Sequence, residues 1–214
     1  EGVAPKIYKL GGNQWQKVRS RVKSKVHDMA LDLLRLQSER ENRKGFAFSK
    51  DDSMQKEFEA NFAYQPTKDQ LLVTSQIKED MEQPHPMDRL LVGDVGFGKT
   101  EVAFRAIFKA ILDQKQVLFL CPTTILSNQH YETAMQRFES FPIEIGLLNR
   151  FTSKKETNRI IAGLKDGTID LVIGTHRLLS NDIKPKDLGL LVIDEEQRFG
   201  VRQKEKIKMY KSNI

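Results

Sequence analysis

A glycine-rich segment at residues 93–100 has the residue types and spacing of a phosphate-binding loop. It reads Gly-Asp-Val-Gly-Phe-Gly-Lys-Thr and matches the pattern G-x-x-x-x-G-K-S/T in full. The glycines permit a tight backbone path that turns successive N–H groups toward an anion. The residues expected to contact a nucleotide here are Gly93, Gly96, Phe97, Gly98, Lys99 and Thr100. Lys99 suits the β and γ phosphates, and the hydroxyl of Thr100 suits Mg²⁺.

Two carboxylates follow an apolar run later in the chain. Residues 190–193, Leu-Leu-Val-Ile, lead directly into Asp194 and Glu195. Such acids alone also suit the start of a solvated helix, because helix N-termini favour negative charge. Beside a phosphate loop they suit ATP hydrolysis, with Asp194 holding Mg²⁺ and Glu195 orienting and deprotonating the attacking water. Lys99, Asp194 and Glu195 are therefore the candidate catalytic residues, and ATP and Mg²⁺ are the expected cofactors.

Short apolar runs alternate with helical segments from Thr67 onward, which predicts a parallel sheet built from βαβ units. The predicted strands are residues 89–92, 117–121, 143–148, 169–173 and 190–193. The predicted helices are residues 67–81, 99–112, 127–138, 153–164 and 201–210, and the fourth opens with the capping-box pattern Ser153-Lys-Lys-Glu156. The expected fold class is α/β with a mostly parallel, doubly wound sheet. Ligands of such sheets bind at the carboxyl ends of the strands, so Lys99 and Asp194 must meet at that edge.

The first fifty residues differ from the rest in charge. They hold 12 Lys and Arg against 5 Asp and Glu, whereas the whole chain has a net charge of +6, so the basic excess belongs to this segment. A basic patch attracts phosphate backbones or an acidic protein partner. The alternative is a solvated helix face, which is common for charge runs of this size.

A long amphipathic helix is expected in the same segment. Apolar side chains recur at helical spacing after a Gly-Gly-Asn break, namely at Trp15, Val18, Val22, Val26, Met29, Leu33 and Leu36. This pattern predicts a helix over residues 14–44, ended by Gly45 and followed by a short helix over residues 54–60. We expect residues 1–50 to form a basic linker arm and residues 51–214 to form the domain that carries the chemistry.

Composition excludes several other classes of protein. The chain has 214 residues, 39% of them apolar and 30% charged, which suits a folded domain with a highly charged surface. It has neither an apolar run long enough for a membrane span nor a secretory signal, so we expect a soluble, cytoplasmic protein. Cys121 stands alone and can form neither an internal disulfide nor a multi-cysteine zinc site, and a buried, inert thiol is expected there.

Residues 60–214 resemble the superfamily-two helicases and translocases. The motifs appear in the family's order: Thr67-Lys-Asp-Gln70 preceded by Phe62, the loop at 93–100, Pro122-Thr-Thr124, Gly174-Thr-His176, and Asp194-Glu-Glu-Gln197. The resemblance implies a RecA-like P-loop NTPase fold, here the N-terminal motor domain, and a motif at Gln70 that reads adenine. Gln70 also suits a capping box with Thr67, and both roles stay open at this point.

Within that family the chain is similar to two bacterial branches, the translocases that couple transcription to DNA repair and the fork-remodelling helicases. The segments Tyr8-Lys-Leu-Gly-Gly-Asn-Gln-Trp15 and Gly45-Phe-Ala-Phe48, which flank the basic helix, favour the first branch. That branch implies a motor that hydrolyses ATP to move along double-stranded DNA, displaces stalled RNA polymerase and brings in nucleotide-excision repair proteins. The polymerase and the repair proteins would bind through modules outside these 214 residues.

The family pattern continues beyond residue 214 with another strand, a Ser/Thr-Ala-Thr motif and a second motor domain that supplies an arginine finger. We therefore expect a C-terminally truncated motor domain. Because such a finger contributes ~10³ to 10⁵ in rate in related phosphoryl-transfer systems, this chain alone should bind nucleotide weakly and turn it over hardly at all.

Hydroxyls and cations follow the second to fourth predicted strands, where they suit contacts to a DNA backbone. The candidate DNA-binding residues are Thr123, Thr124, Arg150, Thr175, His176 and Arg177. The sequence departs from the family pattern beside them, with Ser127-Asn128 in place of Ala-Gln and Asn149 in place of Ser. Two alternative functions remain at this point: a fork-remodelling helicase, and a module in which the basic arm docks a protein under control of the nucleotide site.

Overall fold

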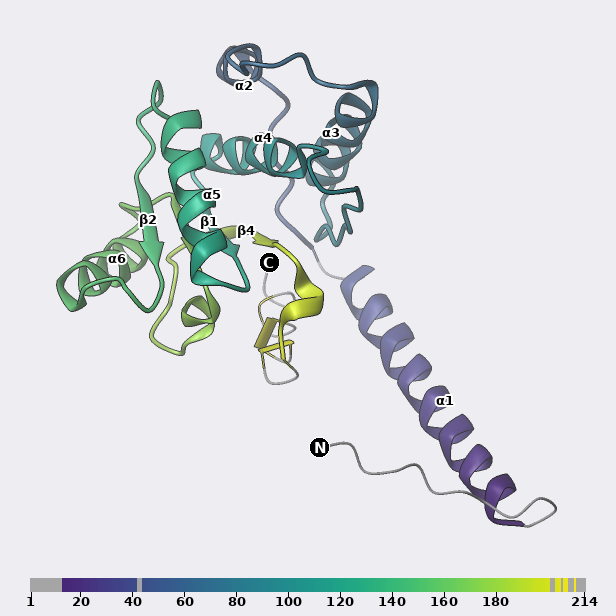
Figure 1. Ribbon diagram of the computed structural model, residues 1–214. Coiled ribbons are helices and arrows are strands. Elements are labelled where there is room, and N and C mark those ends of the chain that lie inside the picture. The colour runs from purple at the N-terminus through teal and green to yellow at the C-terminus, as the bar shows by residue number, and fades with distance from the viewer. Residues whose placement is uncertain (1–12, 42–43, 201–202, 205, 208–209, 211–214) are drawn as a thin grey trace. The chain divides into compact units, whose positions relative to one another are not determined.

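The chain divides into two compact units, Glu1–Arg43 and Lys44–Ile214. The computed structural model describes residues 13–41, 44–200, 203–204, 206–207 and 210 (Figure 1). The sequence predicted a division after residue 50, whereas residues 44–50 pack with the second unit. The N–H of Gly45 donates to the oxygen of Pro84, and that of Phe48 donates to the oxygen of Met81, each at 2.9 Å.

The described residues of the first unit, 13–41, form one long helix, α1 (Asn13–Glu41). No glycine or proline interrupts its sequence, and Lys, Arg, Gln, Glu and Leu, which favour helix, are frequent in it. The predicted helix over residues 14–44 is thus confirmed in its main part, although Lys44 is not helical. The side chains of Trp15, Val22 and Val26 are more than half exposed.

The second unit is built on a four-stranded parallel sheet. Its strands are β1 (Gln116–Leu120), β2 (Ile145–Leu148), β3 (Leu171–Gly174) and β4 (Leu188–Ile193), in the order β2-β3-β1-β4. The register pairs Leu120 with Gly174 on one side and with Ile193 on the other. All four carboxyl ends therefore lie at one edge, as the predicted α/β fold requires.

The first predicted strand, residues 89–92, does not form. These residues adopt no regular secondary structure, and the side chains of Leu90 and Val92 are 82% and 80% exposed. A strand forms only where its backbone N–H and C=O groups pair with a neighbour. Within the described residues β4 pairs with β1 alone, and residues 89–92 do not pair with its open edge. An apolar run in the sequence is therefore not sufficient to predict a β-strand.

The helices of the second unit lie mostly where the sequence predicted them. They are α2 (Ser53–Ala60), α3 (Lys68–Met81), α4 (Lys99–Leu112), α5 (Thr124–Arg137) and α6 (Lys154–Asp166), with the short 3-10 helices η1 (His176–Leu179) and η2 (Glu196–Arg198). Of the predicted helix at 201–210, residues 203, 204, 206, 207 and 210 are helical and the rest lies outside the described residues. No helix in the described part of the chain is long and apolar enough to cross a membrane.

Helix caps explain two of the boundaries. Thr67 and Gln70 form a complete capping box at the start of α3. At α6, Ser153 accepts a hydrogen bond from the N–H of Glu156, but the carboxylate of Glu156 bonds to Arg159 and not back to the cap. The capping box predicted at Ser153 is therefore only half formed, because an arginine competes for its glutamate.

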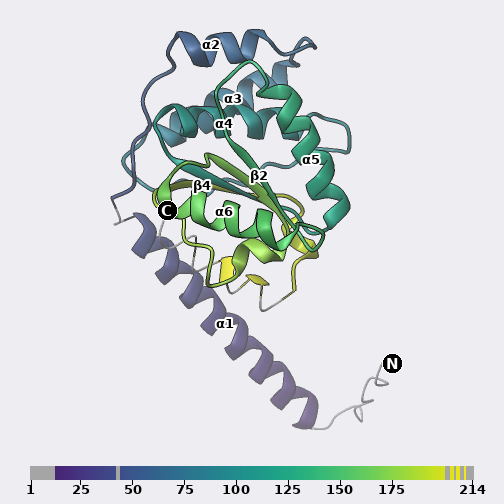
Figure 2. The ribbon, with the colours of Figure 1, turned by 90° about the vertical axis from the view of Figure 1, so that its left-hand side faces the viewer.

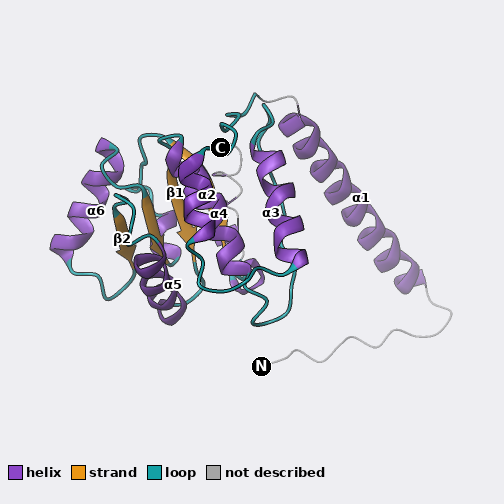
Figure 3. Cartoon of the chain, turned by 90° about the horizontal axis from the view of Figure 1, so that it is seen from above, coloured by secondary structure: helices purple, strands orange, loops and turns teal. Residues whose placement is uncertain are grey.

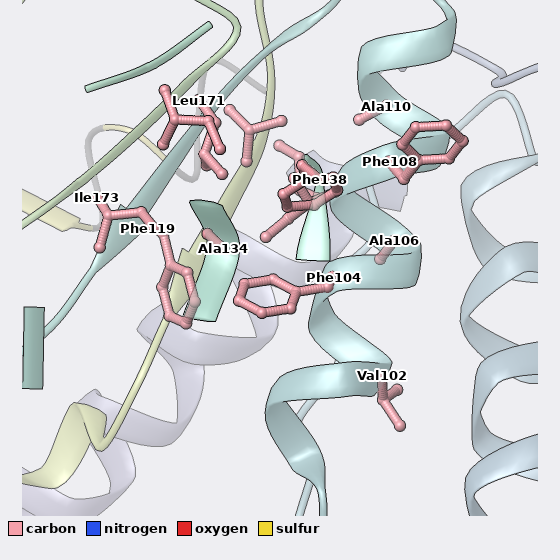
Figure 4. Close-up of a cluster of buried hydrophobic side chains, with 14 of the residues drawn as sticks. Val102, Phe104, Ala106, Phe108, Ala110, Phe119, Ala134, Phe138, Leu171 and Ile173 are labelled. Atoms are coloured by element: carbon pink, nitrogen blue, oxygen red, sulfur yellow. The ribbon is translucent and has the colours of Figure 1, made fainter. Parts of the chain in front are cut away.

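Each face of the sheet is covered by a separate apolar core. β1 alternates between them, as a strand must: Val117 and Phe119 face the core made with α2, α3, α4 and α5, whereas Leu118 and Leu120 face the core made with α6 and η1. Figures 2 and 3 show α4 and α6 on opposite sides of the sheet. In the first core, the ring of Phe104 lies 6.4 Å from that of Phe119 (Figure 4). The sheet is thus packed on both faces, and its carboxyl edge lies between the two cores.

Candidate functional site

The loop at residues 93–100 leads into the N-terminus of α4 through two left-handed glycines. Gly96 has φ +84° and Gly98 has φ +70°, a region that side chains other than glycine rarely adopt. A Cβ on Gly98 would also lie 2.3 Å from Gln70 Nε2, so position 98 excludes a side chain for two reasons. The φ angle of Gly93 is not positive, so the backbone conformation at position 93 does not require glycine.

Lys99 points back into this loop. Its Nζ donates hydrogen bonds to the backbone oxygens of Gly93 at 2.6 Å and Asp94 at 2.8 Å. Gly98, the N-cap of α4, makes no side-chain cap, so the first N–H groups of the helix have no side-chain acceptor there. An ammonium group beside an uncapped helix N-terminus is a favourable place for a phosphate, which can accept hydrogen bonds from both.

Gln70 serves the cap and the loop at once. Its Oε1 accepts from the N–H of Thr67 at 2.9 Å, and its Nε2 donates to the backbone oxygen of Phe97 at 2.8 Å. The capping role is present, and the same amide reaches the phosphate loop. Whether Gln70 also contacts adenine stays a prediction.

Asp194 follows β4 at the carboxyl edge of the sheet. Its N–H donates to the oxygen of Leu120 at 2.9 Å, which continues the ladder with β1. Oδ2 of Asp194 lies 3.0 Å from Nε2 of His130, a residue of α5. This hydrogen bond is the main reason that the pKa of Asp194 lies below its usual value; burial opposes the shift, and the positive charge of Lys99 adds to it. Lys99 and Asp194 are thus near enough to interact electrostatically.

Glu195 adopts an unusual backbone conformation. Its φ of 50° and ψ of 52° lie in the left-handed region, which is strained for a residue with a side chain. Its Oε2 forms an ion pair with Nε of Arg198 at 2.5 Å. The geometry is not that of a hydrogen bond, and this buried oxygen has no hydrogen-bond partner. The conformation turns the chain sharply after Asp194 into η2.

The residues gathered here fit a magnesium-nucleotide complex. Mg²⁺ prefers oxygen ligands, and the candidates for this role are the carboxylate of Asp194 and the hydroxyl of Thr100. Thr100 is the second residue of α4 and is half-buried. Oε2 of Glu195 is buried and forms the ion pair with Arg198, but it accepts no hydrogen bond. Lys99 and the uncapped N-terminus of α4 supply the positive charge that favours the binding of phosphates.

The threonines predicted to contact DNA differ in accessibility. Thr123 is the N-cap of α5, where its Oγ1 accepts from the N–H of Leu126 at 3.2 Å. Thr124 is the first residue of that helix and is half-buried. Thr175 is only 4% exposed, so its hydroxyl is poorly placed for an external phosphate.

The cations predicted to contact DNA also differ. Arg150 is exposed, and its guanidinium lies 4.6 Å from the ring centre of Phe151. His176 is exposed at the start of η1. Arg177, in contrast, donates from Nη1 and Nη2 to the two carboxylate oxygens of Asp182, at 2.7 and 2.5 Å. A phosphate would have to compete with that carboxylate.

The departures from the family pattern form one cluster. Nδ2 of Asn149 donates to Oγ of Ser127 at 3.1 Å and to Oδ1 of Asn128 at 2.9 Å. Asn149 is 5% exposed, and its Oδ1 accepts from the N–H of Phe151. These residues fix the turn that presents Arg150, and their contact was not evident from sequence because α5 and the turn are over twenty positions apart.

His130 was missed by the sequence analysis. It lies in the middle of α5, and nothing in the spacing of the chain connects it to Asp194, 64 positions later. Cys121, in contrast, is as expected: it is fully buried, and burial, followed by the negative charge of Asp194, raises the pKa of its thiol to about 12. At neutral pH that thiol is protonated and inert.

The chain is similar to known proteins in sequence and in structure. Over its whole length the chain is 62% identical to the Transcription-repair-coupling factor of Bacillus subtilis (strain 168) and 53% identical to that of Staphylococcus aureus (strain USA300). It spans 18% of the length of each. The fold is similar to the solved structure of RecG bound to a three-way DNA junction, with a TM-score of 0.75 and 37% sequence identity. The match covers 87% of this chain and 26% of the RecG chain.

A family model confirms the predicted motor fold. Residues 67–214 match the model described as DEAD/DEAH box helicase. The match includes the phosphate loop and the acidic residues after β4, and the domains of this family are RecA-like. The chain therefore belongs to the DEAD/DEAH box helicase family.

Proposed function

We propose that this chain is the ATP-binding half of an ATP-dependent translocase on double-stranded DNA, in a protein that removes stalled RNA polymerase and recruits nucleotide-excision repair. The observation that carries the proposal is the phosphate loop, in which Nζ of Lys99 lies beside the uncapped N-terminus of α4 and bonds to the backbone oxygens of Gly93 and Asp94. The positive charge of Lys99 helps to lower the pKa of the Asp194 carboxyl, although the two residues are far apart in sequence. The names of the relatives at 62% and 53% identity support the choice of repair coupling.

The roles of the site residues follow from their chemistry. Lys99 would exchange the carbonyls of Gly93 and Asp94 for β and γ phosphate oxygens, which are stronger acceptors because they are charged. The N–H groups at the start of α4 would bind the same phosphates. Thr100 and Asp194 would hold Mg²⁺, which when bound neutralises charge on the transferred phosphoryl group.

Glu195 is the proposed general base. It follows the proposed metal-binding acid directly, at a residue whose backbone leaves the extended conformation of β4 for the left-handed region. The ion pair with Arg198 engages its Oε2, so a proton from water would be accepted by Oε1 or by a carboxylate released from that pair. We propose that this contact keeps Glu195 out of its active position in the isolated chain.

DNA would bind at the carboxyl edge of the sheet through contacts to its backbone. Arg150 and His176 are exposed there, and Thr124 lies at the N-terminus of α5, where a phosphate can accept backbone hydrogen bonds. RNA polymerase and repair proteins would bind parts of the longer protein. A second motor domain of that protein would supply the catalytic arginine, so we propose that this chain alone binds nucleotide but hydrolyses it very slowly.

The test is MgATP binding by this chain and by Lys99→Ala, measured with a fluorescent ATP analogue. Lys154→Ala is the matched control, because Lys154 is likewise the first residue of a helix, α6, and is exposed. Lys99→Ala should abolish binding and Lys154→Ala should not change it. Equal affinities for the two variants would refute the nucleotide site and with it the motor function.

A fork-remodelling helicase is the second candidate, favoured by the TM-score of 0.75 to RecG. The identity of 37% to RecG is lower than that to the coupling factors. In the full-length protein, ATP hydrolysis stimulated more strongly by branched than by linear duplex DNA would favour this candidate.

A further inference from the structure

His130 links helix α5 to the acidic residue that follows β4. Its Nε2 lies 3.0 Å from Oδ2 of Asp194, and its side chain is 14% exposed. The imidazole ring packs at 4.8 Å from the ring of Phe119 in β1, with the planes tilted by 33°. A ring held between a strand and a carboxylate has little freedom to turn, so the hydrogen bond to Asp194 is pre-oriented.

The helix that carries His130 is itself fixed at its start. Thr123 caps it, and Oγ of Ser127, three residues before His130, accepts from the side chain of Asn149. Residues three apart lie on the same side of a helix. That side of α5 is therefore tied to the segment after β2 through Ser127 and to the segment after β4 through His130.

The Asp194 carboxylate has acceptor positions to spare. Two oxygens provide about four positions for donors or a metal, and the contact from His130 occupies one of them. The side chain is 27% exposed. The contact with His130 thus restrains the rotation of the carboxylate without consuming its capacity to bind a cation.

We propose that His130 is a positioning residue that holds the Asp194 carboxylate in the orientation in which it takes up Mg²⁺ together with nucleotide. The inference rests on the proposed nucleotide site. It adds a residue of α5 to that site, and it assigns His130 a role distinct from packing against Phe119. Hydrogen-bonded partners of metal-binding side chains have this effect in general, and their loss costs ~10- to 100-fold in metal affinity.

Two substitutions separate positioning from packing. His130→Phe keeps an aromatic ring against Phe119 and removes the hydrogen bond. His130→Gln removes the ring but keeps an N–H donor at a similar distance from the backbone. If His130 positions Asp194, the glutamine variant should resemble the wild type and the phenylalanine variant should not. If His130 only packs, the order should be the reverse.

The experiment measures binding of a fluorescent ATP analogue by the 214-residue chain while Mg²⁺ is titrated, and again in excess EDTA. His130→Phe should raise the half-saturating Mg²⁺ concentration about 10-fold and leave binding in EDTA unchanged, and His130→Gln should restore most of the loss. In an Asp194→Asn background His130→Phe should have no further effect. Thermal unfolding followed by circular dichroism verifies that each variant folds. Should His130→Phe not fold, His130→Asn, whose amide is too short to reach Asp194, replaces it with the same expectation.

The outcomes distinguish this inference from the proposed function. The role of His130 is refuted if His130→Phe has the Mg²⁺ dependence of the wild type, or if it loses as much nucleotide affinity in EDTA as in Mg²⁺. Either result leaves the proposed function intact. A wild-type chain that binds no nucleotide, or whose binding is unaffected by Lys99→Ala, overturns the proposed function and this inference with it.

Discussion

Gln70 donates a hydrogen bond from Nε2 to the backbone oxygen of Phe97 at 2.8 Å, which joins the start of α3 to the phosphate loop. The same side chain closes the capping box with Thr67. One amide therefore fixes both the helix end and the loop that precedes α4.

Gln70→Ala and Thr67→Ala should separate these two roles. Each removes part of the capping box and should lower the free energy of unfolding by ~1 kcal/mol. Only Gln70→Ala also removes the contact to Phe97, so it alone should weaken nucleotide binding. Denaturant unfolding and nucleotide titration measure the two effects. Equal loss of nucleotide affinity in both variants would mean that Gln70 acts on the site through the cap alone.

Glu101→Gln should destabilise the protein strongly. The carboxylate of Glu101 is 7% exposed and accepts from Nε of Arg105 and from Nε and Nη2 of Arg137, all at 2.9 Å. Its loss leaves two buried guanidinium groups without that charge, which typically costs ~3–5 kcal/mol.

Glu156→Gln is the control for that substitution. Glu156 pairs with Arg159 on the surface, where both side chains are more than 40% exposed, and such pairs contribute ~0–1 kcal/mol. Urea unfolding of the two variants measures the difference. A loss from Glu101→Gln no larger than that from Glu156→Gln would contradict the structural importance of the buried cluster.

Asp51→Asn should remove a contribution to stability that depends on pH. Burial acts to raise the pKa of Asp51, but hydrogen bonds from Lys78 at 2.5 Å and Lys109 at 2.9 Å outweigh it, and the pKa lies below the ordinary value of 3.8. A lowered carboxyl pKa stabilises the folded state above the unfolded pKa, and that stability is lost as pH falls through the folded pKa.

The difference in free energy of unfolding between wild type and Asp51→Asn should therefore be largest at neutral pH and shrink below a pH of about 4. Glu57→Gln, an exposed carboxylate on α2, controls for the loss of one negative charge. Urea unfolding at a series of pH values is the measurement. A difference that grows as pH falls would show that the lysines do not hold Asp51 ionised.

Arg150→Ala and Arg177→Ala should affect DNA binding differently. Arg150 is exposed, so its removal should lower affinity and reduce the log–log salt slope by ~0.9, the value for one phosphate contact. Arg177 is neutralised by Asp182, and its removal should leave the slope nearly unchanged. Asp182→Asn should free Arg177 and tighten binding. Anisotropy of labelled duplex DNA across salt concentrations tests this, and equal slopes for the two arginine variants would contradict it.

Much of the fold was predictable because short-range interactions set it. The start of α4 at Lys99 and the cap of α3 at Thr67 depend on residues within one helical turn, and both lie where the pattern predicted. The run at residues 89–92 has an equally clear apolar pattern and forms no strand. A strand needs a neighbour, and a pattern within one segment carries no information about whether that neighbour exists.

The order and chemistry of the nucleotide motifs follow from local residue types: a flexible glycine path, a lysine and a pair of acids. The contacts that orient these groups do not. His130 reaches Asp194 across 64 positions, Asn149 bonds to Ser127 across 22, and Arg177 is held by Asp182 instead of facing solvent. The first two are directional bonds of about 3 Å that exist only after the sheet and its helices have packed, and the third depends on how the loop after η1 turns, so periodicity and composition do not contain them.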